Sequence, residues 1–439
     1  MKHLAWFVWV TAVAAAAESR PNIVMILVDD LGYADVSCYG SKVHRTPNID
    51  RLAAEGLRFT DFHSNAAVCS PTRTAFLTGH YPQRYGIEAA IGFVRDEGVP
   101  LSATMVSEVL RADGYRTGVF GKWHVGHVEH FGPNDQGFDE SRCANNNPDY
   151  HSHVSRDGRL DWYRDQKLED EPGYLVDVVT KHATRFIEEN KARPFFLYVP
   201  HLAGHFPFQG PSDPPERQVG KTYNGDAKNG GLPKAQYKRA YREMVESVDA
   251  SVGRIVAALT EAGVRERTLI VFSSDNGGNG EVSVNAPYRG AKGGLFEGGH
   301  RVPTIAHWPG RIRPGTTAAT AMTVDFMPTF VAVTGAKHPA GLKLDGVDLS
   351  GLLFRGETLA SRTFYWREAQ EKAVRHGAWK LIEGGEAPGL YNLDQDPGET
   401  TDLSKAEPAR VRELTAKLAA WEADVGPRKG RRAAAGKAR

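Results

Sequence analysis

The chain has 439 residues, of which 41% are hydrophobic and 24% are charged, and its formal net charge is only +1. This length predicts one large α/β domain followed by a smaller one, and the composition predicts a globular protein with a sizeable core. Because the charges nearly balance, the sequence gives no electrostatic reason to expect a nucleic-acid partner, and we expect none.

The N-terminus has the features of a secretory signal peptide. A basic start is followed by an apolar run, residues 4–17, that ends in four alanines. The run is too short and wrongly flanked for a membrane-spanning helix, and the alternative role, a buried first strand, suits the next segment better. We therefore predict a signal peptide over 1–17, export to the periplasm or outside the cell, and no membrane span in the mature chain.

The pattern of the chain changes near residue 349. Continuous apolar strands alternate with helices before this point, whereas short, turn-separated strands follow it. We predict a large domain over 18–348, a C-terminal subdomain of antiparallel sheet plus helix over 349–426, and a basic disordered tail over 427–439. One short predicted strand, 304–308, precedes residue 349, and those that follow it cover 364–366, 373–375, 379–382 and 389–393.

The first predicted strand, residues 22–28, is a continuous apolar run, as is typical of parallel strands buried on both faces. Asp29 and Asp30 follow it directly. The carboxyl ends of such strands are where open α/β sheets bind ligands, although aspartate is also common at the start of a helix or turn. One acid would be enough for that second purpose, so two adjacent acids favour a cation site.

Residues 69–73, Cys-Ser-Pro-Thr-Arg, are predicted to begin a helix, because proline is tolerated in a first turn. Cys69 would then lie near the helix N-terminus, and Arg73, one turn later, would reach back toward it. These features suit an anion site, and the alternative is a buried cysteine that happens to precede a helix. The other cysteines, Cys38 and Cys143, could form a disulfide or remain free thiols.

Further polar side chains follow three more predicted strands, and another lies in a loop. A glycine-rich loop over 288–303 carries Lys292. Surface lysines and structurally satisfied histidines are common, so each such residue has an ordinary explanation when taken alone. The strand at 115–120 leads to Lys122 and His124, the strand at 194–199 to His205, and the strand at 268–273 to Asp275 and Asn276. The predicted helices cover 46–57, 103–114, 174–189, 235–263 and 410–422.

Taken together, these segments supply oxygen ligands and hydrogen-bond donors. The oxygen ligands are Asp29, Asp30, Asp275 and Asn276, and the donors are Arg73, Lys122, His124, His205 and Lys292. All-oxygen ligation, without paired cysteines or a histidine-rich set, favours Ca²⁺ or Mg²⁺ over Zn²⁺. Donors of this kind around a divalent metal would bind a tetrahedral oxyanion.

This set of residues, in this order, resembles the type I, formylglycine-dependent sulfatases of the alkaline-phosphatase superfamily. The resemblance covers residues 21–402, which is nearly the whole predicted mature chain. It implies a large α/β/α sandwich around a mostly parallel mixed sheet, with a smaller C-terminal domain of antiparallel sheet plus helix. It rests on VDDLG at 28–32, CSPTR to LTGHYPQRYG at 69–86, GKWHVG at 121–126, HFP at 205–207, SSDNGG at 273–278, YRGAKGGLFEGGHRVP at 288–303 and YNLDQDPGET at 391–400.

The resemblance also implies a nucleophile and a metal. A formylglycine-generating or other maturation enzyme would oxidise Cys69 to an aldehyde, which hydrates to a geminal diol. Asp29, Asp30, Asp275 and Asn276, with a diol oxygen of the modified Cys69, would surround Ca²⁺, with Mg²⁺ as the alternative. One diol hydroxyl, activated by the metal and Arg73, would attack sulfur, whereas a serine would remain trapped as its sulfate ester.

The remaining site residues take their implied roles from the same resemblance. Lys122 and Lys292 would neutralise charge on the sulfate oxygens, and His205 would protonate the leaving alcohol with Lys292 nearby. Lys122, His205 and Lys292 would therefore bind the substrate. His124 would hydrogen-bond the second diol hydroxyl and help to expel sulfate.

The expected activity is hydrolysis of a sulfate ester, and the export signal favours a sulfated carbohydrate as its substrate. The alternatives are a phosphonate or phosphate ester hydrolase of the same superfamily, and a non-catalytic protein that binds sulfated glycans. Residues 141–147 depart from the family pattern, so no role is assigned to Asn145 to Asn147. Candidate specificity residues, chosen because they lie near the site motifs along the chain, are Trp123, Asn145, Tyr150, His151, His201 and Arg289.

Overall fold

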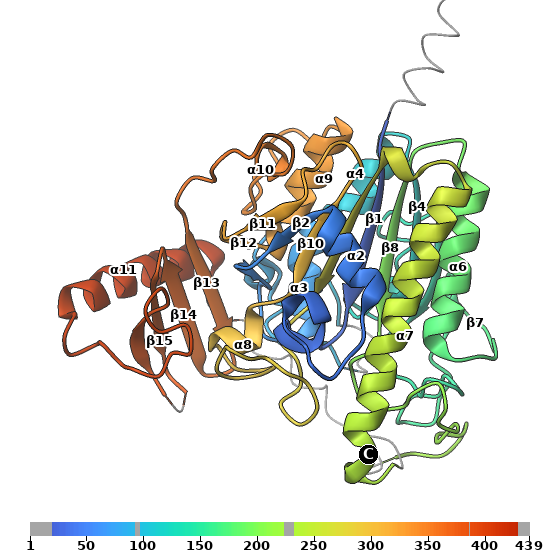
Figure 1. The fold of residues 1–439 in the computed structure, drawn as a ribbon, viewed down its shortest axis with the longest axis horizontal. Coiled ribbons are helices and arrows are strands. Elements are labelled where there is room, and N and C mark those ends of the chain that lie inside the picture. The colour runs from blue at the N-terminus through green and yellow to red at the C-terminus, as the bar shows by residue number, and fades with distance from the viewer. Residues whose placement is uncertain (1–19, 93–96, 224–231, 386, 429–439) are drawn as a thin grey trace, which may run out of the picture.

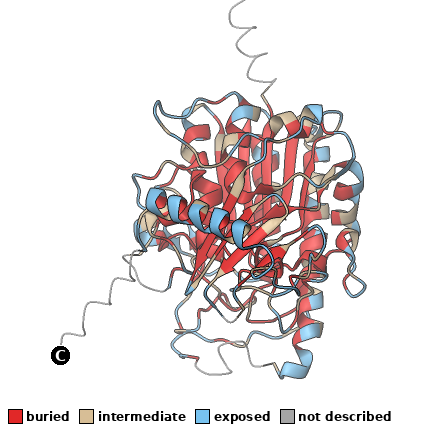
Figure 2. Ribbon diagram, turned by 90° about the vertical axis from the view of Figure 1, so that its left-hand side faces the viewer, coloured by how far each residue is buried: buried red, intermediate tan, exposed pale blue. Residues whose placement is uncertain are grey.

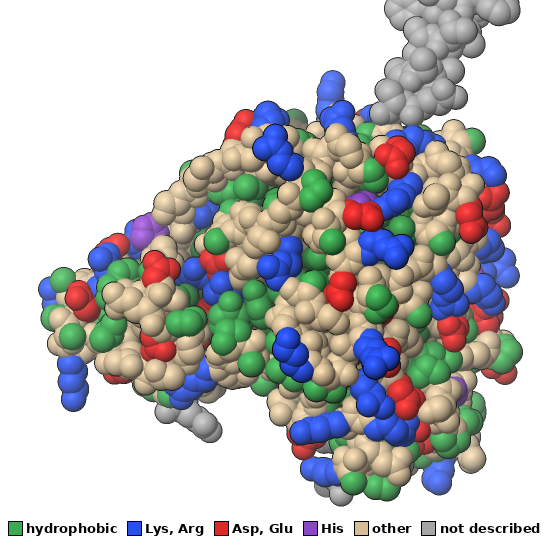
Figure 3. All heavy atoms as spheres, viewed as in Figure 1, with side chains coloured by type: hydrophobic (Ala, Val, Ile, Leu, Met, Phe, Trp, Pro, Cys, Tyr) green, Lys and Arg blue, Asp and Glu red, His purple; other side chains and the backbone are tan. Residues whose placement is uncertain are grey.

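The structure is a computed structural model that describes residues 20–92, 97–223, 232–385 and 387–428. The predicted signal peptide, 1–17, lies outside these residues, and so does the predicted tail from residue 429 onward. Within the described ranges, no helix has the length and apolar character that crossing a membrane requires. On the face shown in Figure 3, basic and acidic side chains are interspersed over the surface.

A mixed sheet of ten strands forms the centre of the large domain (Figure 1). Neighbouring strands from β9 through β1, β8 and β4 to β5 run parallel. By contrast, β10 is antiparallel to both of its neighbours, and β6 and β7 extend the other edge in antiparallel fashion. In spatial order the strands are β11 (Gly315–Thr317), β2 (Leu57–Phe59), β10 (Thr304–His307), β9 (Thr268–Ser274), β1 (Asn22–Val28), β8 (Phe195–His201), β4 (Arg116–Lys122), β5 (Glu140–Ala144), β6 (Tyr163–Arg164) and β7 (Lys167–Leu168).

Helices cover both faces of this sheet, so its central strands are buried on both sides (Figure 2). Successive side chains of β1 point to opposite faces. Val24 and Ile26 belong to one core cluster, whereas Ile23 and Met25 belong to another. The first cluster includes residues of α2 (Pro47–Glu55), α6 (Leu175–Asn190) and α7 (Lys234–Glu261), and the second includes residues of α3 (Cys69–Thr78), α4 (Val106–Ala112), α9 (Phe326–Thr334) and α10 (Ser350–Arg355).

A second, antiparallel sheet lies beside the large domain and is covered by helix α11 (Pro408–Val425) (Figure 1). Its strands, in order, are β13 (Thr363–Glu368), β14 (Glu371–His376), β15 (Trp379–Glu383) and β16 (Gly389–Asn392). A third core cluster joins this sheet and α11 to Ala75 of α3 and to Leu295. The predicted architecture, a large α/β/α sandwich with a smaller antiparallel sheet plus helix, is thus confirmed, while the domain boundary at residue 349 stays a prediction.

Short elements connect these layers near the site. Helices α5 (Val128–Phe131) and α8 (Glu297–His300) each form a single turn. Strand β3 (Phe62–His63) pairs in parallel with β12 (Ala321–Met322) outside the central sheet. The segment that carries β3 leads directly into α3.

Predicted and observed elements differ mainly at their ends. The helix predicted over 46–57 ends at Glu55, because the following residues form β2 and pair with β10 and β11. The strand predicted over 115–120 extends to Lys122, so this lysine lies within the strand itself. Strand β5, with the sequence ESRCA, was not predicted, because it lacks a continuous apolar run. Cys38, Cys69 and Cys143 are all free thiols, which answers the question that the sequence left open.

Candidate active site

The candidate site lies where four neighbouring parallel strands end. These strands, β9, β1, β8 and β4, are consecutive in the sheet, and their carboxyl ends share one edge. Asp29 and Asp30 follow β1, and Asp275 and Asn276 follow β9. Residues brought in by all four strands therefore converge on one place, as the sequence predicted from the strand ends.

Helix α3 brings its first turn to this edge. Cys69 is the first helical residue, preceded by Val68 in an extended conformation, and all ten residues of the helix are buried. Arg73 lies one turn later and donates from Nε to Asp275 Oδ2 at 2.9 Å. Its Nη1 also donates to the backbone oxygen of Lys122 at 2.9 Å. The arginine thus connects α3 to the ends of β9 and β4.

Three buried carboxylates occupy the centre of the site. Lys122 Nζ donates to Asp29 Oδ2 at 2.5 Å, and Lys292 Nζ donates to Asp30 Oδ2 at 2.7 Å. Asp30 has a left-handed backbone (φ 57°), and its N–H donates to Asp275 Oδ1 at 3.2 Å. Each carboxylate therefore has a cationic partner that comes from a different segment of the chain, with Arg73 serving Asp275.

The buried carboxylic acids differ in pKa because they lie close together and have different charged neighbours. Burial raises the pKa of Asp29, but Lys122, His205 and Arg73 outweigh burial and hold that pKa well below its ordinary value. Burial, together with the negative charge of Asp29, raises the pKa of Asp275 to about 7. Without a further positive charge, the site therefore resists ionising all of its carboxyl groups at once.

Unsatisfied oxygen atoms indicate where a cation would fit. Asp29 Oδ1 and Asn276 Oδ1 are buried and accept no hydrogen bond within the described structure. Ligand atoms of Asp29, Cys69 and Asp275 all lie within 4.8 Å of one another. Carboxylate and amide oxygens suit Ca²⁺ or Mg²⁺, so the residues present fit the metal that the sequence predicted.

The thiol of Cys69 is poorly suited to act as a nucleophile in its own right. The residue is only 1% exposed, and Lys122 Nζ lies 3.7 Å from its Sγ. Burial nevertheless raises the pKa of Cys69 to about 11, against the opposing effect of Lys122 and Lys292. Since the thiolate is the reactive form, an unmodified Cys69 would remain a protonated, inert thiol at neutral pH.

Two histidines complete the predicted set, and both are buried. His124, with a left-handed backbone (φ 55°), hydrogen-bonds the backbone oxygen of Ile91 through Nε2 at 3.0 Å, while its Nδ1 is unsatisfied in the described structure. His205 donates from Nδ1 to the backbone oxygen of Phe206 at 2.8 Å, and its Nε2 lies 3.7 Å from Asp30 Oδ2. Burial and nearby lysines hold both pKa values well below the ordinary histidine value, so each ring is neutral and has one nitrogen lone pair.

Gly204 explains how the His205 loop approaches the first strand. Its backbone is left-handed (φ 109°), and a Cβ at this position would lie 2.0 Å from the backbone oxygen of Asp29. Only glycine fits such a contact. The loop can therefore place His205 beside Asp30.

The structure brings all ten predicted site residues together and adds one that was left unassigned. Asn147 Oδ1 accepts from Lys122 Nζ at 2.8 Å, and Arg217 Nη1 donates to the backbone oxygen of Asn147 at 2.9 Å. Asn147 thus orients the lysine that faces Cys69. The only sequence signal for it was the Asn145–Asn147 run itself, which does not indicate which amide points inward.

The predicted specificity residues need correction, because three of the six serve the fold. Trp123 is fully buried and donates to the backbone oxygen of Phe131, and His201 is fully buried and hydrogen-bonds Ser251. Tyr150 OH donates to the backbone oxygens of Leu202 and His205, so it braces the His205 loop. Arg289 is exposed, stacks over Phe296 and donates to the backbone oxygen of Glu399, and its role in specificity stays a prediction. Nearness to the site motifs along the chain predicted specificity residues poorly, because the sequence does not show in which direction a side chain points.

A cavity of about 450 Å³ adjoins the site at His124. It is lined by polar side chains that include His127, Asn146 and Asp157, and Asn145 is the one predicted specificity residue among its lining. Leu168 and Val219, two of the large apolar side chains that are exposed, also line it. The cavity therefore combines hydrogen-bonding groups with an apolar edge next to the buried charges.

Comparisons with known proteins agree with this geometry. The family model described as Sulfatase matches residues 21–336. Arylsulfatase A from Homo sapiens is 33% identical over 451 residues, which cover 89% of this chain and 85% of that protein. N-acetylgalactosamine-6-sulfatase from Mus musculus is 32% identical over 451 residues, which cover 89% of this chain and 83% of that protein.

Solved structures give the same result for the fold. The crystal structure of Ps i-CgsB in complex with k-i-k-neocarrahexaose superposes with a TM-score of 0.83 at 30% identity, covering 93% of this chain and 94% of that one. The phosphonate monoester hydrolase of Agrobacterium radiobacter superposes with a TM-score of 0.66 at 21% identity, covering 93% and 96%. At that identity, the second likeness concerns the fold alone.

The buried Arg73–Asp275 pair leads to a stability prediction. Arg73→Ala would leave the Asp275 carboxylate buried without its partner, so at pH 9, above the pKa of about 7 of Asp275, we expect the free energy of unfolding to fall by about 3–5 kcal/mol. Arg159→Ala is the matched control, because Arg159 is exposed and pairs with Asp157 at the surface. There we expect a loss below about 1 kcal/mol. Urea unfolding of both variants in the presence of a chelator makes the comparison, and equal losses would contradict it.

Proposed function

The chain belongs to the sulfatase family and is a sulfuric ester hydrolase, and from this premise we propose that it releases inorganic sulfate from a sulfated carbohydrate through an aldehyde derived from Cys69 and a bound Ca²⁺. One observation carries the proposal. The Sγ atom of Cys69 and carboxylate oxygens of Asp29 and Asp275 lie within 4.8 Å of one another, close enough to share one cation, and Sγ also faces the ammonium group of Lys122. A nucleophile placed there would contact both a cation and an anionic substrate.

The low reactivity of the thiol supports modification of Cys69. Formylglycine, once hydrated, supplies one hydroxyl that attacks sulfur and a second that allows the sulfate to leave. Because the cysteine side chain is almost completely buried, we expect the maturation enzyme to act on it before the chain folds. The aldehyde would then occupy the first turn of α3, where the free N–H groups favour negative charge.

The side chains around Cys69 would each have a separate role in the reaction of the sulfate group. Lys122 and Lys292 would neutralise its oxygens, since each ammonium group already lies in the site. Arg73, fixed by Asp275, would favour the ionised nucleophile. The unsatisfied Nδ1 of His124 can accept a proton from a hydroxyl, which suits the step that expels sulfate.

His205 is proposed to protonate the leaving alcohol. In the structure its Nδ1 donates to Phe206, so its Nε2 carries the lone pair. An acid role therefore requires a second proton on the ring. A bound sulfate ester would favour this protonation, because its negative charge opposes the effect of Lys122 and Lys292 on the pKa of His205.

The proposed metal would be held by Asp29, Asp30, Asp275 and Asn276, with Mg²⁺ as the alternative to Ca²⁺. When bound, it would act as a Lewis acid toward the sulfate oxygens and favour the ionised nucleophile. When all three carboxylates of the site are ionised, Arg73, Lys122 and Lys292 equal them in number, although burial raises the pKa of Asp275 to about 7. A divalent cation would thus leave an excess of positive charge, and an anionic ester together with an ionised nucleophile would offset it.

The cavity beside His124 supports a carbohydrate as the alcohol part of the substrate. Polar groups such as His127 and Asn146 can hydrogen-bond hydroxyls, while Leu168 offers an apolar surface to a sugar face. The similar Ps i-CgsB was solved with a carrahexaose, which is consistent with this choice. We also propose that the enzyme acts in the periplasm or outside the cell, on the evidence of the apolar run at 4–17.

Position 69 should carry an aldehyde in the active enzyme. We expect peptide mass spectrometry to find formylglycine there in preparations that release sulfate, and Cys69→Ala to abolish turnover. Cys143→Ala is the matched control, because Cys143 is also a buried free thiol but lies on β5. Active enzyme with only unmodified cysteine at position 69 would contradict the proposed nucleophile.

Turnover should require a divalent cation that prefers oxygen ligands. Asp275→Asn should lower kcat at least about 100-fold and weaken Ca²⁺ binding, whereas the exposed Asp170→Asn should change neither. Because Asp275 keeps its proton below about pH 7 in the metal-free site, Ca²⁺ must displace that proton, and its affinity should fall as pH decreases below 7. Calorimetry on chelated enzyme measures this, and a full rate after exhaustive chelation would disprove the metal.

His205→Ala should affect alcohol leaving groups more than acidic phenols. A nitrophenol leaves without protonation, whereas a sugar alcohol needs a proton, so we expect the loss in kcat/KM to be at least about 10-fold larger for sulfated sugars. Sulfate release from a panel of sulfated monosaccharides and oligosaccharides, assayed beside nitrophenyl sulfate and a phosphonate ester, measures it. Equal losses would make His205 a sulfate contact only, and a preference for nitrophenyl sulfate over every sugar would overturn the carbohydrate assignment.

A further inference from the structure

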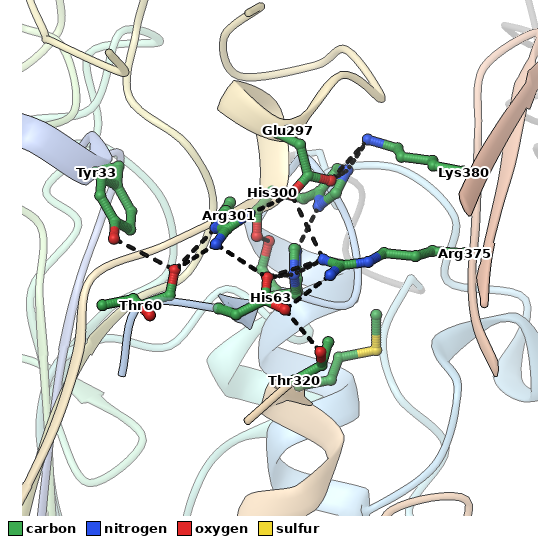
Figure 4. Close-up of polar contacts among 12 residues, drawn as sticks. Tyr33, Thr60, His63, Glu297, His300, Arg301, Thr320, Arg375 and Lys380 are labelled. Carbon is green, nitrogen blue, oxygen red and sulfur yellow. Dashed lines mark hydrogen bonds and ion pairs between the residues drawn. The ribbon is translucent and has the colours of Figure 1, made fainter. Parts of the chain in front are cut away.

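A second buried polar cluster lies between the active-site segments and the C-terminal sheet (Figure 4). At its centre are His63, at the end of β3, and His300, at the end of α8. His63 belongs to the segment that leads into Cys69, and His300 belongs to the loop that carries Lys292. The His63–His300 pair thus joins two stretches of chain that are far apart in sequence and that both contribute to catalysis.

Both nitrogen atoms of each imidazole ring have a hydrogen-bond partner. Their Nδ1 atoms lie 3.0 Å apart, so one proton is shared between them. On the outer side of His63, Nε2 lies 3.0 Å from Asp61 Oδ1 and 2.9 Å from Arg375 Nη1. On the outer side of His300, Nε2 lies 3.0 Å from Lys380 Nζ and 3.2 Å from the backbone oxygen of Leu295.

Two arrangements of neutral rings account for the hydrogen bonds to Lys380 and Arg375. In one arrangement, Lys380 donates to His300, His300 donates to His63, and His63 donates to Asp61. In the other, Arg375 donates to His63, His63 donates to His300, and His300 donates to the oxygen of Leu295. Either way, each ring has one N–H and one lone pair. A first further proton would enter on an outer Nε2 and displace Arg375 or Lys380 from that nitrogen. A second would put a proton on both Nδ1 atoms, place two N–H groups face to face and break the bond between the rings.

The charged side chains around the pair balance one another while both rings are neutral. Asp61, Glu297 and Glu399 face Arg301, Arg375 and Lys380 through ion pairs in this cluster. A proton on either ring would therefore be an unmatched charge in a fully buried site, and burial holds the pKa values of both histidines below their ordinary value. Although His63, Glu297 and His300 have metal-ligand spacing, Arg375 and Lys380 contact the ring nitrogens, so a cation is disfavoured there.

The C-terminal sheet supports both active-site segments around this pair. On the Cys69 side, Trp366 Nε1 donates to the backbone oxygen of Ser64 at 2.9 Å, and the Ala67 N–H donates to Glu368 Oε2 at 2.9 Å. On the Lys292 side, the Glu297 N–H donates to Glu399 Oε2 at 2.6 Å. His300 also stacks on Trp366, with ring centroids 4.3 Å apart.

Within the active site, the two segments touch again. Gly293 N–H, next to Lys292, donates to the backbone oxygen of Ala67 at 2.9 Å. Lys292 itself reaches Asp30. A shift between the segments would therefore move Lys292 relative to Cys69, which the reaction cannot tolerate, because small displacements of a catalytic group are costly.

We propose that His63 and His300 are positioning residues for sulfate ester hydrolysis: their shared hydrogen bond fixes the segment before Cys69 to the loop that carries Lys292, and acid releases it. The inference rests on the proposed role of Lys292 in neutralising the sulfate. The direction of the pH effect follows from the proton that the two rings share. The contact is intact at neutral pH and is lost once the pH has fallen below both pKa values of the pair, which are depressed in the folded protein, because only then are both rings charged.

Replacing the His63 ring by an amide distinguishes the role of the hydrogen bond from the effect of protonating the ring. Asparagine at position 63 can hydrogen-bond His300 but does not titrate, so His63→Asn should keep the neutral kcat and extend activity to lower pH. With Ca²⁺ kept saturating at every pH, we expect the acid limb of kcat to move down by at least about one pH unit, with KM little changed. His300→Phe, which can keep the stacking on Trp366 but not the hydrogen bond, should lower kcat at every pH. The exposed His338→Asn is the matched control and should leave the profile unchanged.

A measurement on the unaltered enzyme does not depend on how the variants fold. Hydrogen–deuterium exchange, corrected for intrinsic rates, should show residues 61–69 and 289–301 losing protection together on acidification, while α6 and α7 stay protected. Protection of both segments until global unfolding, or an unchanged acid limb in a folded His63→Asn, would overturn the inference. Lys292→Ala tests the proposed function separately: a full rate there would remove the role of Lys292 without altering the exchange result.

Discussion

Pairing of buried charges is the constraint on which the rest of this structure depends. Asp29, Asp30 and Asp275 are removed from water at one edge of the central sheet. An unpaired carboxylate in such a place costs several kcal/mol, so each requires a cation. These cations are Arg73 from helix α3, Lys122 from strand β4 and Lys292 from a distant loop. Packing of the sheet and its helices therefore has to bring these segments within hydrogen-bond distance of one another.

The same pairs that stabilise the site are the groups that the reaction uses. Lys122 and Lys292 each donate to a carboxylate, and both would have to exchange part of that contact for a sulfate oxygen. Asp29 Oδ1 and Asn276 Oδ1 accept nothing and offer lone pairs to a cation. The protein alone therefore contains a site that is fixed in place but not electrostatically satisfied, and binding of metal and substrate would complete it.

The C-terminal sheet serves this site although it contributes none of the ten predicted residues. Its side chains contact the segment before Cys69 and the loop that carries Lys292, through Glu368, Lys380 and Arg375 among others. These contacts are buried and mostly ionic, so they are directional as well as stabilising. Precise placement of the nucleophile thus depends on a part of the fold that lies outside the central sheet.

The sequence by itself determined the chemistry of the site. Apolar runs followed at once by Asp29–Asp30 and Asp275–Asn276 predicted buried parallel strands with ligands at their carboxyl ends, because this pattern depends only on neighbouring residues. The tertiary structure alone decided which side chains face the site. Trp123 and His201 point into the core, Asn147 points to Lys122, and His63 meets His300. A loop's conformation and a pairing between distant segments are set by packing across the whole domain, and no local pattern in the chain encodes them.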